Sequence, residues 1–254
     1  MQFNKKTIAN NFNKAAQNYQ NNAHLQQQVA QNLVQNHQNI IKNAKNILDL
    51  GSGSGFIAQL CQQQNLLNLQ QNFINCDIAI NMLKTTKQKS INCDIEFLPI
   101  KPDKIDLIIS SLSFQWLNNF NQTLNQIHQI LPKNGYFICA FLSKNTLKEI
   151  KFCCQQLNIP IKINNFLDPK QINCNFNNIK ITTQTIKKNY NNVIELINSM
   201  KKIGAKYQNT TQSQSISPQQ IRDLNNFYLQ KFSYRSKIRS NWEISYIFAQ
   251  KTNV

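Results

Sequence analysis

Residues 46–56 read Asn-Ile-Leu-Asp-Leu-Gly-Ser-Gly-Ser-Gly-Phe, a short apolar segment that leads into glycines at positions 51, 53 and 55. Glycine adopts positive φ angles at no steric cost and lets the backbone approach a ligand closely. Three of the five glycines of the chain stand in this loop. The stretch therefore predicts a buried strand over 46–50, a ligand-binding loop, and a helix over 54–65.

The residues that flank the glycines indicate the kind of ligand. Phe56 stands where the dinucleotide loop Gly-x-Gly-x-x-Gly needs its third glycine. Asp49 would repel a pyrophosphate, but it would attract the cationic amino-acid end of S-adenosylmethionine. Asp77 ends the next apolar run, where acidic side chains bind ribose hydroxyls in doubly wound folds, and Asp94 ends the run after it. Three acids at successive strand ends favour a nucleoside-binding site over an ordinary strand-turn-helix.

Apolar runs and helical spacing alternate along the rest of the chain, which predicts repeated β-α units. The expected strands are 72–76, 93–98, 105–111, 135–142, 179–188 and 242–249. The expected helices are two within 5–37, then 79–89, 120–131, 146–157, 191–203 and 218–231. Such units form a parallel sheet that binds ligands at the carboxyl ends of its strands. We expect an α/β fold: a Rossmann-like doubly wound sheet, mostly parallel with an antiparallel C-terminal strand, and helices on both faces.

A length of 254 residues suits a single domain, 1–254. Its expected parts are an N-terminal helical lid (1–42), a ligand-binding core (43–145), and a C-terminal half (146–254) with a helical insertion at about 190–232. We find no apolar segment typical of a signal peptide or of a membrane span. We therefore expect a cytoplasmic protein that does not contact a membrane, and a monomer.

Charge and cysteine content bear on the partners. Lys and Arg number 28 against 11 Asp and Glu, a net charge of +17 that should attract polyanions or an acidic protein. The chain is rich in Asn, Gln, Lys and Ile throughout, as a codon bias would produce, so this charge alone selects no partner. Seven cysteines form no Cys-x-x-Cys pair, which indicates reduced, mainly buried thiols and no metal site.

Other chemistries lack their motifs. The three histidines, His24, His37 and His128, form no nucleophile triad and no metal-ligand spacing, which argues against a hydrolase or a metalloenzyme. The segment 110–116 has no Pro-Pro-aromatic motif of the kind that base-amino methyltransferases carry there, and no Pro-Cys nucleophile. Nucleic acid is therefore a less favoured acceptor. The aromatic residues of this segment, Phe114 and Trp116, suit either the site or the core.

Several stretches together resemble the malonyl-acyl-carrier-protein O-methyltransferases of biotin synthesis, which are class I methyltransferases. These stretches are Phe-Asn-Lys-Ala-Ala-Gln-Asn-Tyr (12–19), Ala-His-Leu-Gln (23–26), the glycine loop, Cys-Asp-Ile-Glu-Phe-Leu-Pro (93–99), Gln-Trp (115–116), Phe-Leu-Asp-Pro (166–169) and Met-Lys-Lys-Ile-Gly-Ala (200–205). The glycine loop is common to the whole class, whereas the N-terminal block and the 200–205 stretch are more particular. The family usually has Arg at the position of Lys14 and often Asp at that of His24.

The resemblance implies methyl transfer from S-adenosylmethionine, without a metal, to the free carboxylate of a malonyl thioester on acyl carrier protein. A carboxylate is already ionised at neutral pH, so it needs no general base. The implied donor-binding residues are Asp49, Gly51, Ser52, Gly53, Gly55, Asp77, Ile78, Met82, Asp94, Ile95, Ser110 and Leu112. The residues implied to close over donor and acceptor are Tyr19, Gln115 and Trp116. Candidates for the carrier-protein surface are Lys187, Lys188, Lys201, Lys202 and Lys206.

Three other functions fit parts of the same pattern. A methyltransferase for a small organic acid such as trans-aconitate would share the fold but needs no basic docking face. An RNA methyltransferase would use the positive charge and bind RNA with a steep salt dependence. A non-catalytic assembly factor of the same fold would bind a partner protein without turnover.

Overall fold

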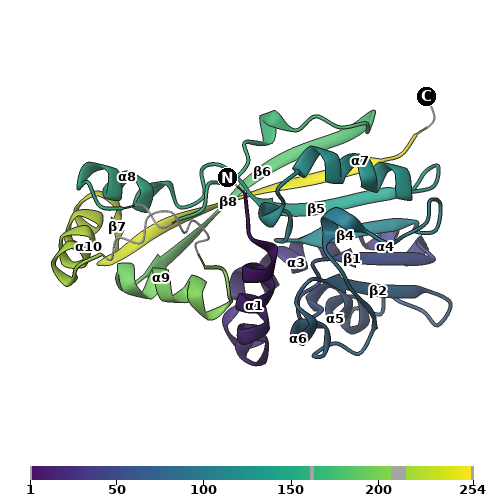
Figure 1. Cartoon of the computed structure of the whole chain (residues 1–254), viewed down its shortest axis with the longest axis horizontal. Coiled ribbons are helices and arrows are strands. Elements are labelled where there is room, and N and C mark those ends of the chain that lie inside the picture. The colour runs from purple at the N-terminus through teal and green to yellow at the C-terminus, as the bar shows by residue number, and fades with distance from the viewer. Residues whose placement is uncertain (1, 161–162, 207–215, 253–254) are drawn as a thin grey trace.

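The computed structural model describes residues 2–160, 163–206 and 216–252. Its centre is an eight-stranded sheet in the order β3-β2-β1-β4-β5-β8-β6, with β7 paired to β8 (Figure 1). The strands are β1 (Asn46–Leu50), β2 (Asn72–Asp77), β3 (Lys89–Asn92), β4 (Leu107–Ser111), β5 (Tyr136–Leu142), β6 (Asn178–Tyr190), β7 (Ser233–Tyr234) and β8 (Lys237–Gln250). The first five pair in parallel, and β8 runs antiparallel to β5 and β6. The predicted fold class is confirmed.

Helices cover both faces of this sheet. They are α1 (Lys5–Ala15), α2 (Tyr19–Asn22), α3 (His24–Asn36), α4 (Gln38–Asn43), α5 (Phe56–Gln63), α6 (Ile80–Leu83), α7 (Phe120–Ile130), α8 (Lys148–Gln156), α9 (Val193–Lys202) and α10 (Pro218–Phe232). One apolar core joins the sheet to α3, α5, α8, α9 and α10. A second core lies under α7, whose Leu124 and Ile127 are fully buried. Two covered faces are what a parallel sheet requires.

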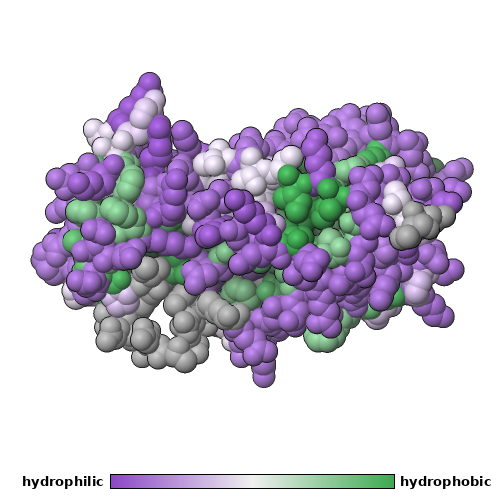
Figure 2. Space-filling view, turned by 90° about the horizontal axis from the view of Figure 1, so that it is seen from above, coloured by the Kyte–Doolittle hydropathy of each residue, from purple (hydrophilic) through white to green (hydrophobic). Residues whose placement is uncertain are grey.

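One face of the molecule is mainly polar despite these large cores. The face in Figure 2 is mainly hydrophilic, and apolar side chains gather on it in only a few places. The many Asn and Gln residues therefore coat an ordinary folded domain. No described helix is both long enough and apolar enough to cross a membrane. All seven cysteines are free, as expected for reduced thiols.

The region after β2 differs from the sequence-based prediction. Helix α6 covers only Ile80–Leu83, not 79–89, and the third strand is 89–92, not 93–98. The hydroxyls of Thr85 and Thr86 donate to the carbonyls of Met82 and Leu83, which satisfies the helix end early. Residues 95–97 instead form a 3₁₀ turn, because the Asp94 carboxylate accepts from the Glu96 backbone N–H at 3.1 Å.

Two further elements were incompletely predicted. The N-terminal region forms four helices and a 3₁₀ turn (Ala16–Asn18), where two helices were expected. The closing strand begins at residue 237 and folds back on β7 through Arg235 and Ser236, whose φ angles are 51° and 60°. Neither residue is a typical turn former at positive φ, so the sequence carried no hairpin signal here.

The N-terminal helices are fastened to the C-terminal half by a small apolar cluster. Ala16, Tyr19 and Ala23 pack with Met82 of α6 and with Ile203, which follows α9. Gly204 has φ +81°, and a Cβ atom there would lie 2.9 Å from the carbonyl oxygen of Asn11. The end of α9 therefore lies directly against α1, as Figure 1 also shows.

Candidate functional site

The glycine loop lies at the carboxyl end of β1 and leads into α5. Its glycines 51, 53 and 55 have φ angles of +66°, +54° and +80°, which other residues rarely adopt. A Cβ atom on Gly51 would lie 2.2 Å from the Cβ of Ser113. The backbone N–H groups of Gly51 and Ser52 both donate to the carbonyl of Cys76, at 2.7 and 3.0 Å. The loop is thus held against β2, and Gly51 leaves room for the side chain of Ser113.

Asp77 supports this loop from the end of β2. Its carboxylate accepts from the backbone N–H of Gly53 at 2.8 Å and of Ala79 at 2.7 Å. Burial raises the pKa of Asp77 to about 6, although these backbone bonds pull it down. The carboxylate is therefore ionised at neutral pH and available to hydroxyl donors of a ligand.

Asp49, on β1, is the most isolated acid of the site. It is 1 % exposed, and neither of its oxygens has a hydrogen-bond partner among the described residues. Burial, and then the charge of Asp77, raise the pKa of Asp49 well above its usual value. A buried carboxylate without partners is costly, so this position calls for a cationic or hydrogen-bonding ligand group.

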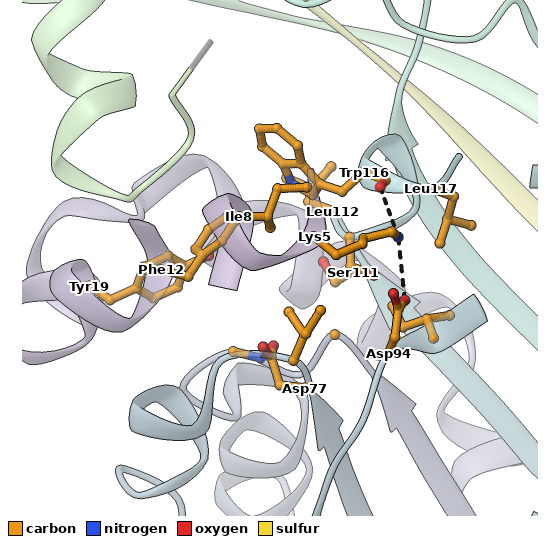
Figure 3. Close-up of a pocket in the computed structure, with 15 residues that line it drawn as sticks. Lys5, Ile8, Phe12, Tyr19, Asp77, Asp94, Ser111, Leu112, Trp116 and Leu117 are labelled. Carbon is orange, nitrogen blue, oxygen red and sulfur yellow. Dashed lines mark hydrogen bonds and ion pairs between the residues drawn. The ribbon is translucent and has the colours of Figure 1, made fainter. Parts of the chain in front are cut away.

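Asp94 lies on the opposite side of the cavity, two residues after β3. Its Oδ1 lies 3.3 Å from the ammonium nitrogen of Lys5, the first residue of α1 (Figure 3). The same ammonium donates to the carbonyl of Trp116 at 3.2 Å. The lid helix is therefore bonded directly to the third acid of the predicted site.

These residues surround two adjoining hollows. The larger holds about 600 Å³ of empty space, part of it open to solvent. Its lining is Lys5, Ile8, Phe12, Tyr19, Gly51, Gly53, Asp77, Ile78, Asp94, Ile95, Ser111, Leu112, Ser113, Trp116 and Leu117. The smaller hollow is lined by Tyr19, Gln26, Ala30, Asp49, Gly51, Ser52, Gly53, Phe56, Ile57 and Ser111. The two hollows share Tyr19, Gly51, Gly53 and Ser111, so they adjoin and together form a cavity region with Asp49 in the smaller and Asp94 in the larger.

Most predicted site residues line this cavity. They are Tyr19, Asp49, Gly51, Ser52, Gly53, Asp77, Ile78, Asp94, Ile95, Leu112 and Trp116. Whether each contacts a ligand stays a prediction.

Four other predicted residues lie behind the lining. Ser110 is buried and donates to the carbonyl of Leu50 at 2.6 Å. Gln115 donates to the carbonyl of Leu112 at 2.6 Å, Met82 is buried among the lid contacts, and Gly55 precedes α5. They shape the wall of the cavity.

Sequence reasoning missed part of the lining. Ser111 lines both hollows, whereas its predicted neighbour Ser110 faces the core, and a one-residue shift along a strand reverses the side of the sheet. Phe12 lies in the quoted N-terminal block, so its contact was within reach. Gln26 lies in the quoted 23–26 stretch and was likewise within reach, whereas Lys5 comes from a helix far away in the sequence and no local pattern marks it.

Aromatic rings close the cavity from the lid side. Trp116 contacts Phe3 and Phe12 edge to face, with centroids 5.6 and 5.8 Å apart. Tyr19 stacks on Phe56 at 5.9 Å. Burial, and then the charge of Asp77, raise the pKa of Tyr19, so its hydroxyl keeps its proton at neutral pH. The cavity therefore has an apolar roof over a floor of acids.

The arrangement fits S-adenosylmethionine on physical grounds. The isolated Asp49 suits a cationic amino-acid end, and Asp77 suits a pair of ribose hydroxyls. Asp94 and Ile95 offer an acceptor and an apolar surface for a purine. Among the described residues, no three His, Cys, Asp or Glu side chains are grouped to hold a metal ion.

Comparison with known proteins agrees with this geometry. Residues 48–139 match a family model described as a methyltransferase domain. The chain is 30% identical to the malonyl-[acyl-carrier protein] O-methyltransferase of Hamiltonella defensa, with 90% of this chain and 89% of that protein covered. The protein of the same name from Buchnera aphidicola is also 30% identical, with 87% and 89% covered.

A second kind of relative matches over a shorter stretch. The human protein named arginine-hydroxylase NDUFAF5, mitochondrial, is 33% identical over 62% of this chain. The match spans about half of that relative, 49% of its length.

Two solved structures share the fold. A methyltransferase of Thermotoga maritima superposes with a TM-score of 0.52 at 13% identity, covering 96% of this chain and all of that one. The YcgJ protein of Bacillus subtilis gives 0.51 at 12% identity, covering 83% and 93%. At such identities the likeness supports the fold alone.

Proposed function

The chain belongs to the malonyl-[acyl-carrier protein] O-methyltransferase family of S-adenosylmethionine-dependent methyltransferases, and from this premise we propose its acceptor. We propose that it methylates the free carboxylate of a malonyl group carried as a thioester on acyl carrier protein. The product would be the malonyl methyl ester that primes pimeloyl synthesis for biotin. The main support is that the similarity extends over 89% of the relatives' length, well beyond the methyltransferase core at 48–139.

In this proposal the three acids divide the donor between them. Asp49, with the backbone of Gly51 and Gly53, would hold the amino-acid end, and Asp77 would hold the ribose hydroxyls. Asp94 and Ile95 would hold the adenine. The bound donor supplies a sulfonium methyl group that is already activated. The protein therefore has to orient the acceptor and exclude water, and does not have to supply a nucleophile.

The roof of the cavity suits this task. Phe12, Tyr19 and Trp116 would separate the reacting atoms from solvent, since their rings form a continuous chain of contacts. The acceptor carboxylate is ionised at neutral pH and attacks without a general base. This agrees with the lining, in which no histidine occurs among the described residues.

A basic surface beside the lid would receive the acidic carrier protein. Lys201 and Lys202 are exposed at the last turn of α9, and the residues that follow pack on the lid. Lys14 is exposed at the last turn of α1. An acidic partner bound there would lie near the cavity roof, and its association would weaken as salt rises.

The test is transfer of labelled methyl from S-adenosylmethionine to malonyl-acyl-carrier protein, beside malonyl-coenzyme A, free malonate, trans-aconitate and bulk RNA. We expect most label on the carrier protein. Reversing two charges with Lys201→Glu and Lys202→Glu should lower kcat/KM for the carrier protein about tenfold or more, with little effect on malonyl-coenzyme A. The matched control reverses Lys101 and Lys104, which are exposed ahead of β4, on the side of its amino end and not of its carboxyl end.

The arginine-hydroxylase relatives suggest a second candidate function. Over the part that matches, the human protein is 33% identical to this chain, against 30% for the two malonyl-[acyl-carrier protein] O-methyltransferases. Modification of a protein arginine would use the same fold with a protein acceptor. This candidate is tested with an extract of cells that lack the protein. If the purified protein labels none of the five acceptors, but adds one oxygen atom to an arginine of a peptide in that extract, arginine hydroxylation would replace the proposed function.

A further inference from the structure

Among the residues that the structure describes, Lys5 is the one cation that lines the larger hollow. Its ammonium contacts three groups from the core: the carboxylate of Glu96, Oδ1 of Asp94 at 3.3 Å, and the carbonyl of Trp116 at 3.2 Å. Figure 3 shows the side chain reaching from the lid helix down to Asp94 and across to Trp116. The side chains of Lys5 and Glu96 are only 23% and 7% exposed, so solvent screens this contact weakly.

The partners of Lys5 are themselves fixed. Glu96 accepts from the backbone N–H groups of Asn118 and Asn119, at 3.1 and 2.7 Å. Burial raises the pKa of Glu96, but the bonds from Lys5 and from these two amides outweigh it and leave the pKa below its usual value. The backbone of Phe3 pairs with the side chain of Asn118 through two hydrogen bonds, at 2.5 and 3.2 Å. Residues 3–5 therefore form one network with the loops that follow β3 and β4.

This network holds only one end of α1. Ile8 and Phe12, in the middle of the helix, cover the cavity, and the far end is held by the close approach of Gly204 to Asn11. Ile8 and Phe12 therefore stay over the cavity as long as both ends are held. The far end is also held by neutral hydrogen bonds, since the backbone N–H of Asn81 donates to Oδ1 of Asn13 at 2.8 Å. The contacts at Lys5 are ionic, so the Lys5 end is the one that salt should weaken.

The contacts of Asp94 show how the network bears on the ligand. Both the ammonium of Lys5 and the backbone N–H of Glu96 bond to Oδ1. No described residue bonds to Oδ2, which stays available for a donor group such as an amino-purine. Lys5 thus fixes the orientation of a carboxylate that the ligand would share.

We propose that Lys5 is a positioning residue that holds the lid helix over the donor cavity and orients Asp94. The inference rests on the donor site of the proposed function and is independent of the acceptor. Exchange of the donor then requires the ion pairs of Lys5 with Asp94 and Glu96 to separate. The lid should release the donor faster when these pairs are lost, although the acids that bind it are intact.

The test compares Lys5→Met with Lys6→Met, in which the exposed neighbour on α1 undergoes the same change. Calorimetry with S-adenosylhomocysteine should show about tenfold weaker binding for Lys5→Met, the value expected from losing charged hydrogen bonds, and a faster dissociation rate by stopped flow. The decrease of affinity with rising salt should be smaller in Lys5→Met than in wild type. Lys6→Met should match wild type in all three measurements.

Hydrogen exchange of the ligand-free protein gives a readout that needs no donor. Amides of α1 should exchange faster in Lys5→Met than in Lys6→Met, while those of α7 stay unchanged. Glu96→Gln should act in the same way, and the double variant should be no worse than Lys5→Met alone. Equal exchange of α1 in the two lysine variants would overturn the proposal. If no variant, wild type included, binds the donor, the donor site fails, and the exchange experiment still decides whether Lys5 holds the lid.

Discussion

Asp77 offers the sharpest physical test, because its charge should affect stability and ligand binding in opposite directions. Burial raises its pKa from 3.8 to about 6. Between these two values the folded protein keeps a proton that the unfolded chain has lost. Stability therefore falls as pH rises through this window, and above it the full cost of the buried charge remains. A shift of about two units corresponds to about 3 kcal/mol.

Asp77→Asn removes this charge and keeps the shape of the side chain. One amide oxygen replaces two carboxylate oxygens, so either the Gly53 or the Ala79 N–H loses its partner, at about 1–3 kcal/mol. This loss is the same at every pH. The free energy of unfolding of the variant, relative to that of wild type, should therefore rise by about 3 kcal/mol between pH 4 and pH 8. Asp49 increases this difference in stability. Burial, and then the charge of Asp77, raise the pKa of Asp49, so removing the charge of Asp77 makes the ionised Asp49 less costly.

Urea unfolding at several pH values measures this difference directly. Asp223→Asn, on the exposed surface of α10, is the matched control and should show no such trend. In calorimetry at pH 8, Asp77→Asn should bind the donor about 1.5–3 kcal/mol more weakly while being no less stable. A stability difference from wild type that stays constant from pH 4 to pH 8 would refute the buried-charge explanation.

Three further substitutions test the glycine loop and the lid. Gly51→Ala forces a side chain to φ +66° against Ser113, so we expect a loss of at least about 1–3 kcal/mol of stability and of donor binding. Urea unfolding and calorimetry measure the two losses, and unchanged binding would mean that the loop can open. Gly204→Ala places a Cβ 2.9 Å from the Asn11 carbonyl and should speed hydrogen exchange in α1 while leaving β1 protected; slow exchange throughout would separate α9 from the lid. Tyr19→Ala should cost about 3–5 kcal/mol of stability and Tyr19→Phe far less, because the ring stacks on Phe56 and packs with Ala16, Met82 and Ile203. Urea unfolding measures both losses, and equal losses would assign the effect to the hydroxyl.

The local signals in the sequence were sufficient for most strands of the sheet and for the acids that line the cavity. The run 46–50 became β1 without change, because a short apolar segment ended by glycines has few other structures open to it. Asp49 and Asp77 were found because carboxyl strand ends converge on one edge of a parallel sheet. The closing strand followed from its alternating pattern, although β8 is longer than 242–249.

The contacts that were missed depend on distant parts of the chain. Lys5 reaches Asp94 and Glu96, about ninety positions away, through a packing of α1 that no local pattern encodes. The short α6 was missed because two threonine hydroxyls, not a glycine or proline, end it. The same limit applies to Ser111, since strand alternation fixes which serine faces the cavity only once the register is known.

Methyl transfer to malonyl-acyl-carrier protein tests the central claim most directly. Purified protein with labelled S-adenosylmethionine should place a base-labile methyl ester on the malonyl group, and Asp77→Asn should lose most of this rate at limiting donor. Label on free malonate or trans-aconitate in preference to the thioester, on RNA alone, or on no acceptor at all would contradict the proposed acceptor.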